Sequence, residues 1–165
     1  YSERERTHHV LEKHVPVTTT GFVLAFGTKH ARSLQDKTFF ISSLSFELKR
    51  KFWRIFSPGI GVDLFYDSST MVELRAFAPE EKWQTIDDFK TGIHLSQELV
   101  YNKFSVTVQE GMYLFLTDKA FDNPMYHRLI IRHKVDHGLF LQVAMKSHSA
   151  VLDFLEFGIG YSGKS

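Results

Sequence analysis

Apolar and polar residues alternate at every second position along much of this chain, and this pattern constrains its fold more than any other feature. Near the C-terminus, Leu139, Leu141, Val143 and Met145 share one parity, whereas Phe140, Gln142, Ala144, Lys146 and His148 share the other. Successive side chains of a β-strand point to opposite faces, so a period of two indicates a strand. Helical periodicity is weak nearly everywhere. The sequence therefore predicts an all-β protein.

Eight segments show the alternation, and their connections suggest how they are joined. The predicted strands are residues 21–30, 38–48, 59–67, 92–101, 103–115, 126–135, 138–148 and 153–161. Residues 101–103 and 135–138 are tight turns, residues 68–91 and 116–125 are longer and polar, and residues 49–58 are the least tidy of the turns. Short and long connections in alternation are typical of an outer-membrane barrel. We expect residues 1–16 to be an N-terminal tail and residues 17–165 to form one barrel domain.

The charged residues of the alternating segments favour a membrane barrel. They fall on the polar faces and carry both signs: Lys29, Glu47, Asp63, Glu98, Arg128, Arg132, Lys134, Lys146 and Glu156. Paired charges can fill the interior of a small barrel, because its interior holds side chains rather than a pore. The apolar faces would then meet lipid, including Leu155, Phe157, Ile159 and Tyr161 of the last strand. We predict an eight-stranded antiparallel transmembrane β-barrel with short periplasmic turns and longer extracellular loops. A soluble barrel with a half-solvated sheet is the alternative.

Composition excludes several classes of function. The net charge is +1 over 165 residues, so no global attraction to nucleic acid is expected, and with no cysteine there are neither disulfides nor thiolate metal sites. No run of eighteen apolar residues predicts a membrane helix. The chain does not begin with Met, and we expect a mature or trimmed form.

Three further segments have local interpretations. His8, His9 and His14 could bind a transition metal, although a solvated tail is the favoured interpretation. Residues 49–54, "KRKFWR", interleave basic and aromatic residues and are interpreted as a turn at the lipid headgroups rather than a nucleic-acid site. Residues 79–89 are the most helix-like part of the long loop.

The stretch "AMKSHSAVLDFLEFGIGYS", residues 144–162, holds the candidate chemistry. If a hairpin turns within residues 150–153, His148 lies roughly opposite Glu156 and on the same face. A carboxylate that orients a histidine is half of a nucleophilic triad, and Ser149 or Ser147 would supply the hydroxyl. Ser149 can meet His148 only where the strand has ended or bulges, because neighbouring residues point to opposite faces. The alternative is a structural polar cluster of Lys146, His148 and Glu156.

The hairpin "LFLQVAMKSHSAVLDFLEFGIGYS", preceded by "LIIRHK", resembles the end of the lipid A 3-O-deacylase and acyloxyacyl hydrolase family of outer-membrane barrels. The resemblance is moderate over the last four strands and general over the rest. His148 falls on the family's histidine. Ala150 falls where the family has its serine, Ser149 lies between them, and the family's Asn and small residue are absent. For the acidic member, Asp153 matches by its distance from "GIGY" and Glu156 by its strand face.

The resemblance implies an enzyme that removes a fatty acyl chain from lipid A with a Ser-His-acid triad. His148 would be the general base, Ser149 the nucleophile, and Asp153 or Glu156 the orienting acid. It implies no cofactor and no metal, a place in the bacterial outer membrane, and outer-membrane lipid and lipopolysaccharide as partners. A non-catalytic barrel that serves as a structural or partner-binding subunit among other envelope proteins is the rival hypothesis, and the alanine at position 150 favours it.

Overall fold

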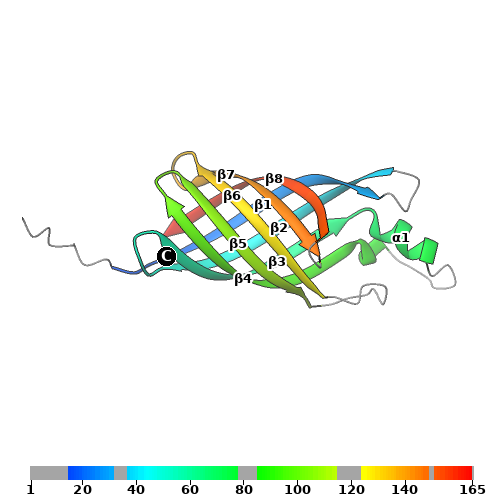
Figure 1. Cartoon of the computed structure of the whole chain (residues 1–165), viewed down its shortest axis with the longest axis horizontal. Helices are drawn as coiled ribbons and strands as arrows, with labels where there is room; N and C mark the ends of the chain where they lie inside the picture. The colour runs from blue at the N-terminus through cyan, green and yellow to red at the C-terminus, as the bar shows by residue number, and fades with distance from the viewer. Residues whose placement is uncertain (1–14, 32–36, 78–84, 115–123, 149–150, 165) are drawn as a thin grey trace, which may run out of the picture.

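The computed structural model describes residues 15–31, 37–77, 85–114, 124–148 and 151–164, and their eight strands close into one barrel. Each strand pairs antiparallel with the next, and the last pairs with the first (Figure 1). The strands are β1 (Val17–Ala31), β2 (Lys37–Lys51), β3 (Phe56–Asp67), β4 (Phe89–Tyr101), β5 (Phe104–Tyr113), β6 (Met125–Lys134), β7 (Leu139–His148) and β8 (Val151–Lys164). The predicted number of strands and their antiparallel order are confirmed.

The two ends of the barrel differ in their connections. One end, called here the turn end, carries the short links β2–β3, β4–β5 and β6–β7 (Figure 1). The first residue of β1 and the last residue of β8 lie at this end too. The opposite end, called the loop end, carries α1 (Thr70–Phe77) and a 3-10 turn, η2 (Thr85–Asp88). Among the described residues, no helix has the length and apolar character needed to cross a membrane.

The helix of the long loop lies earlier in the chain than predicted. The sequence predicts the most helix-like segment at residues 79–89, but α1 spans Thr70–Phe77 and only the short η2 turn lies within the predicted range. Residues 79–84 are outside the described residues. The side chain of Asp88 accepts a hydrogen bond of 3.0 Å from the backbone N–H of Met71. This contact satisfies a donor in the first turn of α1, which has no partner within the helix.

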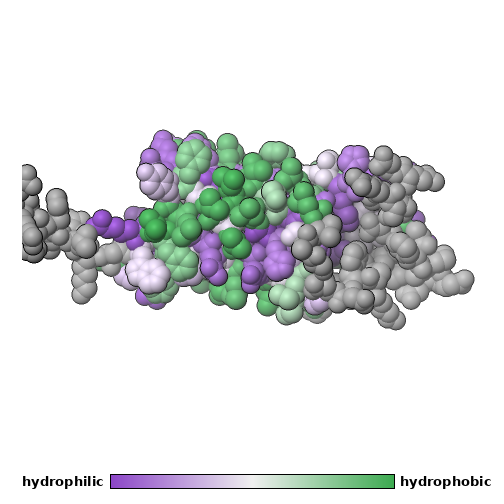
Figure 2. Space-filling view, viewed as in Figure 1, coloured by the Kyte–Doolittle hydropathy of each residue, from purple (hydrophilic) through white to green (hydrophobic). Residues whose placement is uncertain are grey.

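The outer face of the barrel is apolar and its inner face is polar. Residues in β5 and β7 alternate strictly between exposed and buried over most of their length, as the sequence pattern predicted. Leu139, Leu141, Val143, Met145, Leu155, Phe157, Ile159 and Tyr161 are all exposed. Figure 2 shows hydrophobic residues covering much of the barrel wall, with hydrophilic residues toward the ends and in a patch between them. A soluble barrel would bury its apolar face, so this distribution is that of a transmembrane barrel.

Aromatic side chains gather on the outer face near both ends of the barrel. At the loop end, four rings from neighbouring strands follow one another with centroids 6.0, 6.5 and 5.2 Å apart: Phe26, Phe40, Tyr66 and Phe89. At the turn end, Trp53 packs against Phe56 at 5.5 Å, and Tyr101 is exposed. Such rings mark the two interfaces between hydrocarbon and water.

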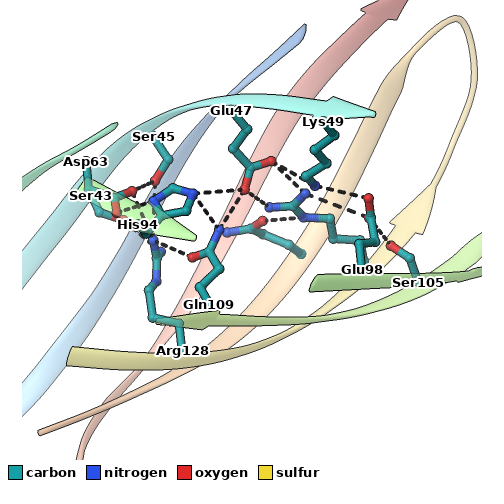
Figure 3. A network of polar contacts seen from close by, with 12 residues as sticks. Ser43, Ser45, Glu47, Lys49, Asp63, His94, Glu98, Ser105, Gln109 and Arg128 are labelled. Carbon is teal, nitrogen blue, oxygen red and sulfur yellow. Dashed lines mark hydrogen bonds and ion pairs between the residues drawn. The ribbon is translucent and has the colours of Figure 1, made fainter. Parts of the chain in front are cut away.

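Ion pairs fill the middle of the barrel, where Arg128 is buried (Figure 3). Its guanidinium pairs with Glu156 and lies 3.4 Å from Asp63. Asp63 also receives hydrogen bonds from the hydroxyls of Ser45 and Tyr126. Opposite charges from strands that are not paired with one another meet inside the barrel, and a buried charge requires such a partner.

A second cluster lies nearer the turn end and centres on Glu47 (Figure 3). Arg132 donates to both carboxylate oxygens of Glu47 at 2.7 and 2.8 Å, and Lys49 pairs with Glu47 at 3.0 Å and with Glu98 at 3.1 Å. The interpretation of Lys49 as a headgroup contact in a turn is therefore wrong, because β2 continues to Lys51 and its alternation turns Lys49 inward. Lys134, by contrast, is exposed rather than enclosed.

Candidate active site

The pairing of β7 with β8 decides which carboxylate reaches His148. Ala144 lies opposite Glu156 and Lys146 opposite Phe154, but the register then shifts so that Ser147 lies opposite Leu152. Asp153 is the β8 residue left without a partner, as in a β-bulge. Regular alternation would point Asp153 outward, because its neighbour Phe154 is buried inside. The bulge lets the Asp153 side chain turn toward β7.

Both ring nitrogens of His148 have partners. Nδ1 contacts the carboxylate of Asp153, and Nε2 lies 3.0 Å from the hydroxyl of Tyr113. The rings of Tyr113 and His148 stack at 5.6 Å with an interplanar angle of 18°. A carboxylate on one nitrogen fixes the tautomer, so that the other nitrogen can accept a proton from a hydroxyl.

The other predicted residues are placed differently. Glu156 is fully buried, lies opposite Ala144 and pairs with Arg128, so the prediction that it lies opposite His148 is wrong. The hairpin closes nearer to the histidine than the sequence interpretation assumed, with His148 opposite Val151. Ser149 and Ala150 lie outside the described residues. Ser147 belongs to β7 and has the parity of its lipid-facing residues.

Lys146 lies two residues before His148 on the same inward face. Its ammonium nitrogen is 3.3 Å from the centroid of Phe65, and three further rings surround it at 5.1 to 5.3 Å: Tyr113, Tyr126 and Phe154. Lys146 is 2% exposed, and cation–π attraction to these rings replaces part of its lost hydration. The predicted polar cluster of Lys146, His148 and Glu156 therefore does not form as one group. Lys146 and His148 line the same cavity, whereas Glu156 pairs with Arg128 at the barrel centre.

A small cavity of about 60 Å³ adjoins this site at the loop end. It is lined by Tyr113, Lys146, His148 and Asp153 together with Lys29 of β1 and Asp67 of β3. Lys29 pairs with Asp67 at 3.4 Å and contacts the hydroxyl of Ser69 at 3.2 Å. The cavity is large enough for a small polar group or a few water molecules.

Sequence reasoning missed Tyr113. It comes from β5, 35 residues before His148, and nothing local in the sequence connects the two. The only signal was its inward parity in β5, which many residues share. Within the described part of the chain, no group of three or more His, Asp or Glu side chains is placed to hold a metal ion.

Comparison with known protein families shows to which family this barrel belongs. The family model described as "Acyloxyacyl hydrolase, C-terminal domain" matches residues 18–165. The chain belongs to this acyloxyacyl hydrolase family. The resemblance inferred from the C-terminal hairpin is thus confirmed and extends over nearly the whole chain.

Solved structures with the same architecture include designed proteins. A structure described as "De novo design of transmembrane beta-barrels" has a TM-score of 0.51 and 12% identity, covering 91% of this chain and 98% of that one. The solution NMR structure of the de novo designed TMB2.3 has a TM-score of 0.49 and 13% identity, covering 90% of this chain and 96% of that one. At such identity the first likeness shows the fold alone. No curated protein matches the chain.

Proposed function

We propose that the protein hydrolyses an acyl ester of lipid A in the outer membrane of a Gram-negative bacterium. The observation that carries the proposal is the contact between Asp153 and His148, made by a bulge at the loop end of a barrel of the acyloxyacyl hydrolase family. The apolar outer face of the barrel is suited to contact with outer-membrane lipid and lipopolysaccharide.

The proposed roles follow the contacts of His148. Asp153 holds Nδ1, so Nε2 acts as the general base. Ser149 follows His148 directly and is the proposed nucleophile. Its hydroxyl oxygen bonds to the ester carbon while His148 takes the proton; the alcohol then leaves with that proton. Water attacks the acyl-enzyme, releasing the fatty acid and restoring the hydroxyl of Ser149.

Tyr113 imposes a condition on this chemistry. Its hydroxyl lies at Nε2 of His148, the nitrogen that must receive the proton. The nucleophile has to replace Tyr113 at this nitrogen before the reaction begins. Removing the phenol by Tyr113→Phe should therefore leave hydrolysis intact or increase it.

A non-catalytic barrel is the second candidate function. The alanine at position 150, where the family's serine falls in the resemblance, favours it. In that case His148, Asp153 and Tyr113 tie β5, β7 and β8 together at the loop end, and the barrel serves as a structural or partner-binding subunit among envelope proteins.

Incubation of the purified barrel with lipid A, followed by mass spectrometry of released fatty acid, tests the proposal. We expect His148→Ala and Ser149→Ala to lower the rate by about 10²-fold or more, and Asp153→Asn to lower it strongly. His30→Ala is the matched control, because His30 is exposed at the same end of the barrel. Release that persists unchanged in His148→Ala, or no release from the unaltered protein, would reject the proposal.

A further inference from the structure

A second, larger cavity lies at the turn end of the barrel, away from His148. Its volume is about 410 Å³, and each of the eight strands contributes to its lining. Sites for small molecules commonly enclose about 300–1,000 Å³. Because the barrel wall is closed around the cavity, a ligand enters along the barrel axis from the aqueous side rather than from the bilayer. The cavity therefore suits a soluble molecule of moderate size.

Paired charges close this cavity toward the centre of the barrel (Figure 3). Arg132 donates to both carboxylate oxygens of Glu47, and Lys49 lies 3.1 Å from Glu98. Gln109 donates a further hydrogen bond of 2.7 Å to Glu47. Among the described residues, the two cavities have no lining residue in common. The layer of two cations and two carboxylates thus forms a floor that is balanced in charge.

The other ionisable side chains that line the cavity are all cations. They are Lys51, Lys103, Lys134 and Lys164. Counting every described residue of the lining, six cations face two carboxylates, which leaves a formal charge of +4. A concave surface lined by an excess of one sign concentrates ions of the opposite sign. The turn end therefore attracts anions into the barrel.

Two of these lysines lie directly beside each other. The backbone N–H of Lys134 donates a hydrogen bond of 2.7 Å to the carbonyl of Lys103, which continues the pairing of β5 with β6. Both side chains are exposed at the rim, and both line the cavity. Like charges directly opposite one another on paired strands are destabilising. An anion held between the two ammonium groups removes that cost.

Lys164 reaches the cavity from the facing wall. It lies opposite Thr19 of β1, and three strands separate β1 from β5 in either direction around the closed barrel. Cations on facing walls suit a ligand that carries negative groups at two positions. A phosphomonoester carries a charge of about −1.5 to −2 at pH 7, so two such groups match the excess of +4.

We propose that the turn-end cavity binds a soluble organic molecule that carries at least two phosphate groups. One phosphate lies between Lys103 and Lys134, and another lies toward Lys164. The short turns of an outer-membrane barrel face the periplasm, so the ligand comes from that compartment. Binding involves no covalent step and does not depend on hydrolysis at His148, which lies at the other end of the barrel.

Isothermal titration calorimetry of the full chain in uncharged detergent micelles tests the proposal, with fructose 1,6-bisphosphate as the probe. We expect saturable binding of one molecule per barrel, at least tenfold tighter than binding of inorganic phosphate. Fructose, which has the same body without the phosphates, should not bind. No saturable binding of the bisphosphate would overturn the proposal. Tighter binding of citrate would overturn the choice of phosphate over carboxylate.

Variants of the lysines locate the binding site. Lys103→Gln and Lys134→Gln should each weaken binding several-fold, and the double variant should weaken it about tenfold. Arg50→Gln is the matched control, because Arg50 is exposed at the same end and has the outward parity of β2. An equal loss in Arg50→Gln would show attraction by surface charge alone and would overturn the assignment. His148→Ala should bind the probe unchanged, so failure of the proposed hydrolysis leaves this test intact.

Vesicles distinguish a soluble ligand from a lipid headgroup. The affinity for the bisphosphate should be the same in phosphatidylcholine vesicles with and without phosphatidylglycerol. Binding that is lost when phosphatidylglycerol is present would identify the headgroup as the occupant and overturn the assignment to a soluble molecule.

A purely structural role for the lysines makes a different prediction. Without ligand, Lys134→Gln should leave the free energy of unfolding unchanged or raise it, because it relieves the repulsion with Lys103. The bisphosphate should raise the melting temperature of the unaltered barrel more than that of the double variant. A marked loss of stability in ligand-free Lys134→Gln would show that this lysine serves the fold and would count against the proposal.

Discussion

Replacing Glu47 alone should destabilise the barrel far more than replacing Glu47 and Arg132 together. Glu47 is 5% exposed and accepts two hydrogen bonds from Arg132, with Lys49 at 3.0 Å. Glu47→Leu leaves two buried cations facing Glu98 alone. Breaking a buried pair in this way lowers the free energy of unfolding by about 3–5 kcal/mol.

The double variant Glu47→Leu with Arg132→Met leaves a balanced pair, because Lys49 and Glu98 remain 3.1 Å apart. Replacing a whole buried ion pair with apolar residues is often neutral. We therefore expect the free energy of unfolding of the double variant to lie within about 1 kcal/mol of that of the unaltered barrel. The loss in the double variant would then be smaller than the sum of the two single losses by about 3 kcal/mol or more, and this difference is the coupling energy of the pair.

Urea unfolding in detergent, followed by tryptophan fluorescence, measures these differences, and the chain has two tryptophans for the purpose. The single variants Glu47→Leu and Arg132→Met and the double variant complete a cycle. Phe46→Leu, a lipid-facing change beside Glu47, serves as the control. If the double variant loses the sum of the two single losses, then the ion pair is not coupled and the reasoning about this cluster is refuted.

Four other changes test the barrel wall, its packing and its turns with the same unfolding measurement. Leu129→Arg, at the middle of the lipid-facing side of β6, should lower the free energy of unfolding by about 2–4 kcal/mol, and a neutral effect would argue against contact with hydrocarbon. Gly111→Ala should destabilise by about 1–3 kcal/mol because an added Cβ would lie 2.1 Å from the ring of Tyr126. Gly163→Ala, where the nearest atom would be 3.6 Å away, should be tolerated, and equal losses at the two glycines would contradict the packing. Gly138→Ala should lower the free energy by about 1–2 kcal/mol because this residue has φ of 89°, and an unchanged value would show that the turn relaxes.

Much of the architecture could be predicted because strand geometry has a short, local period. Alternation alone assigned Leu139, Leu141 and Val143 to the outside and Gln142 and Lys146 to the inside. Strand ends were less accurate. The strands β1 and β2 extend beyond the predicted residues, because pairing with a neighbour continues wherever backbone hydrogen bonds can form.

The candidate site shows which contacts a local sequence pattern cannot predict. His148, Asp153 and Ser149 were all named from the sequence, and His148 was correctly assigned to the inner face. The choice between Asp153 and Glu156 was open, because parity favoured Glu156 and spacing favoured Asp153. A bulge changes parity by one residue and leaves no mark in the pattern of apolar residues, so only the paired strands decide between the two carboxylates.

The sequence by itself determined the class of barrel, the faces of its strands and the histidine at its loop end, because each depends on residues close together in the chain. Tertiary structure decided the partners. Tyr113 reaches His148 from 35 residues away, and Arg128 pairs with Glu156 from 28 residues away. Register is a property of paired strands and closure of the sheet, and no single segment specifies it.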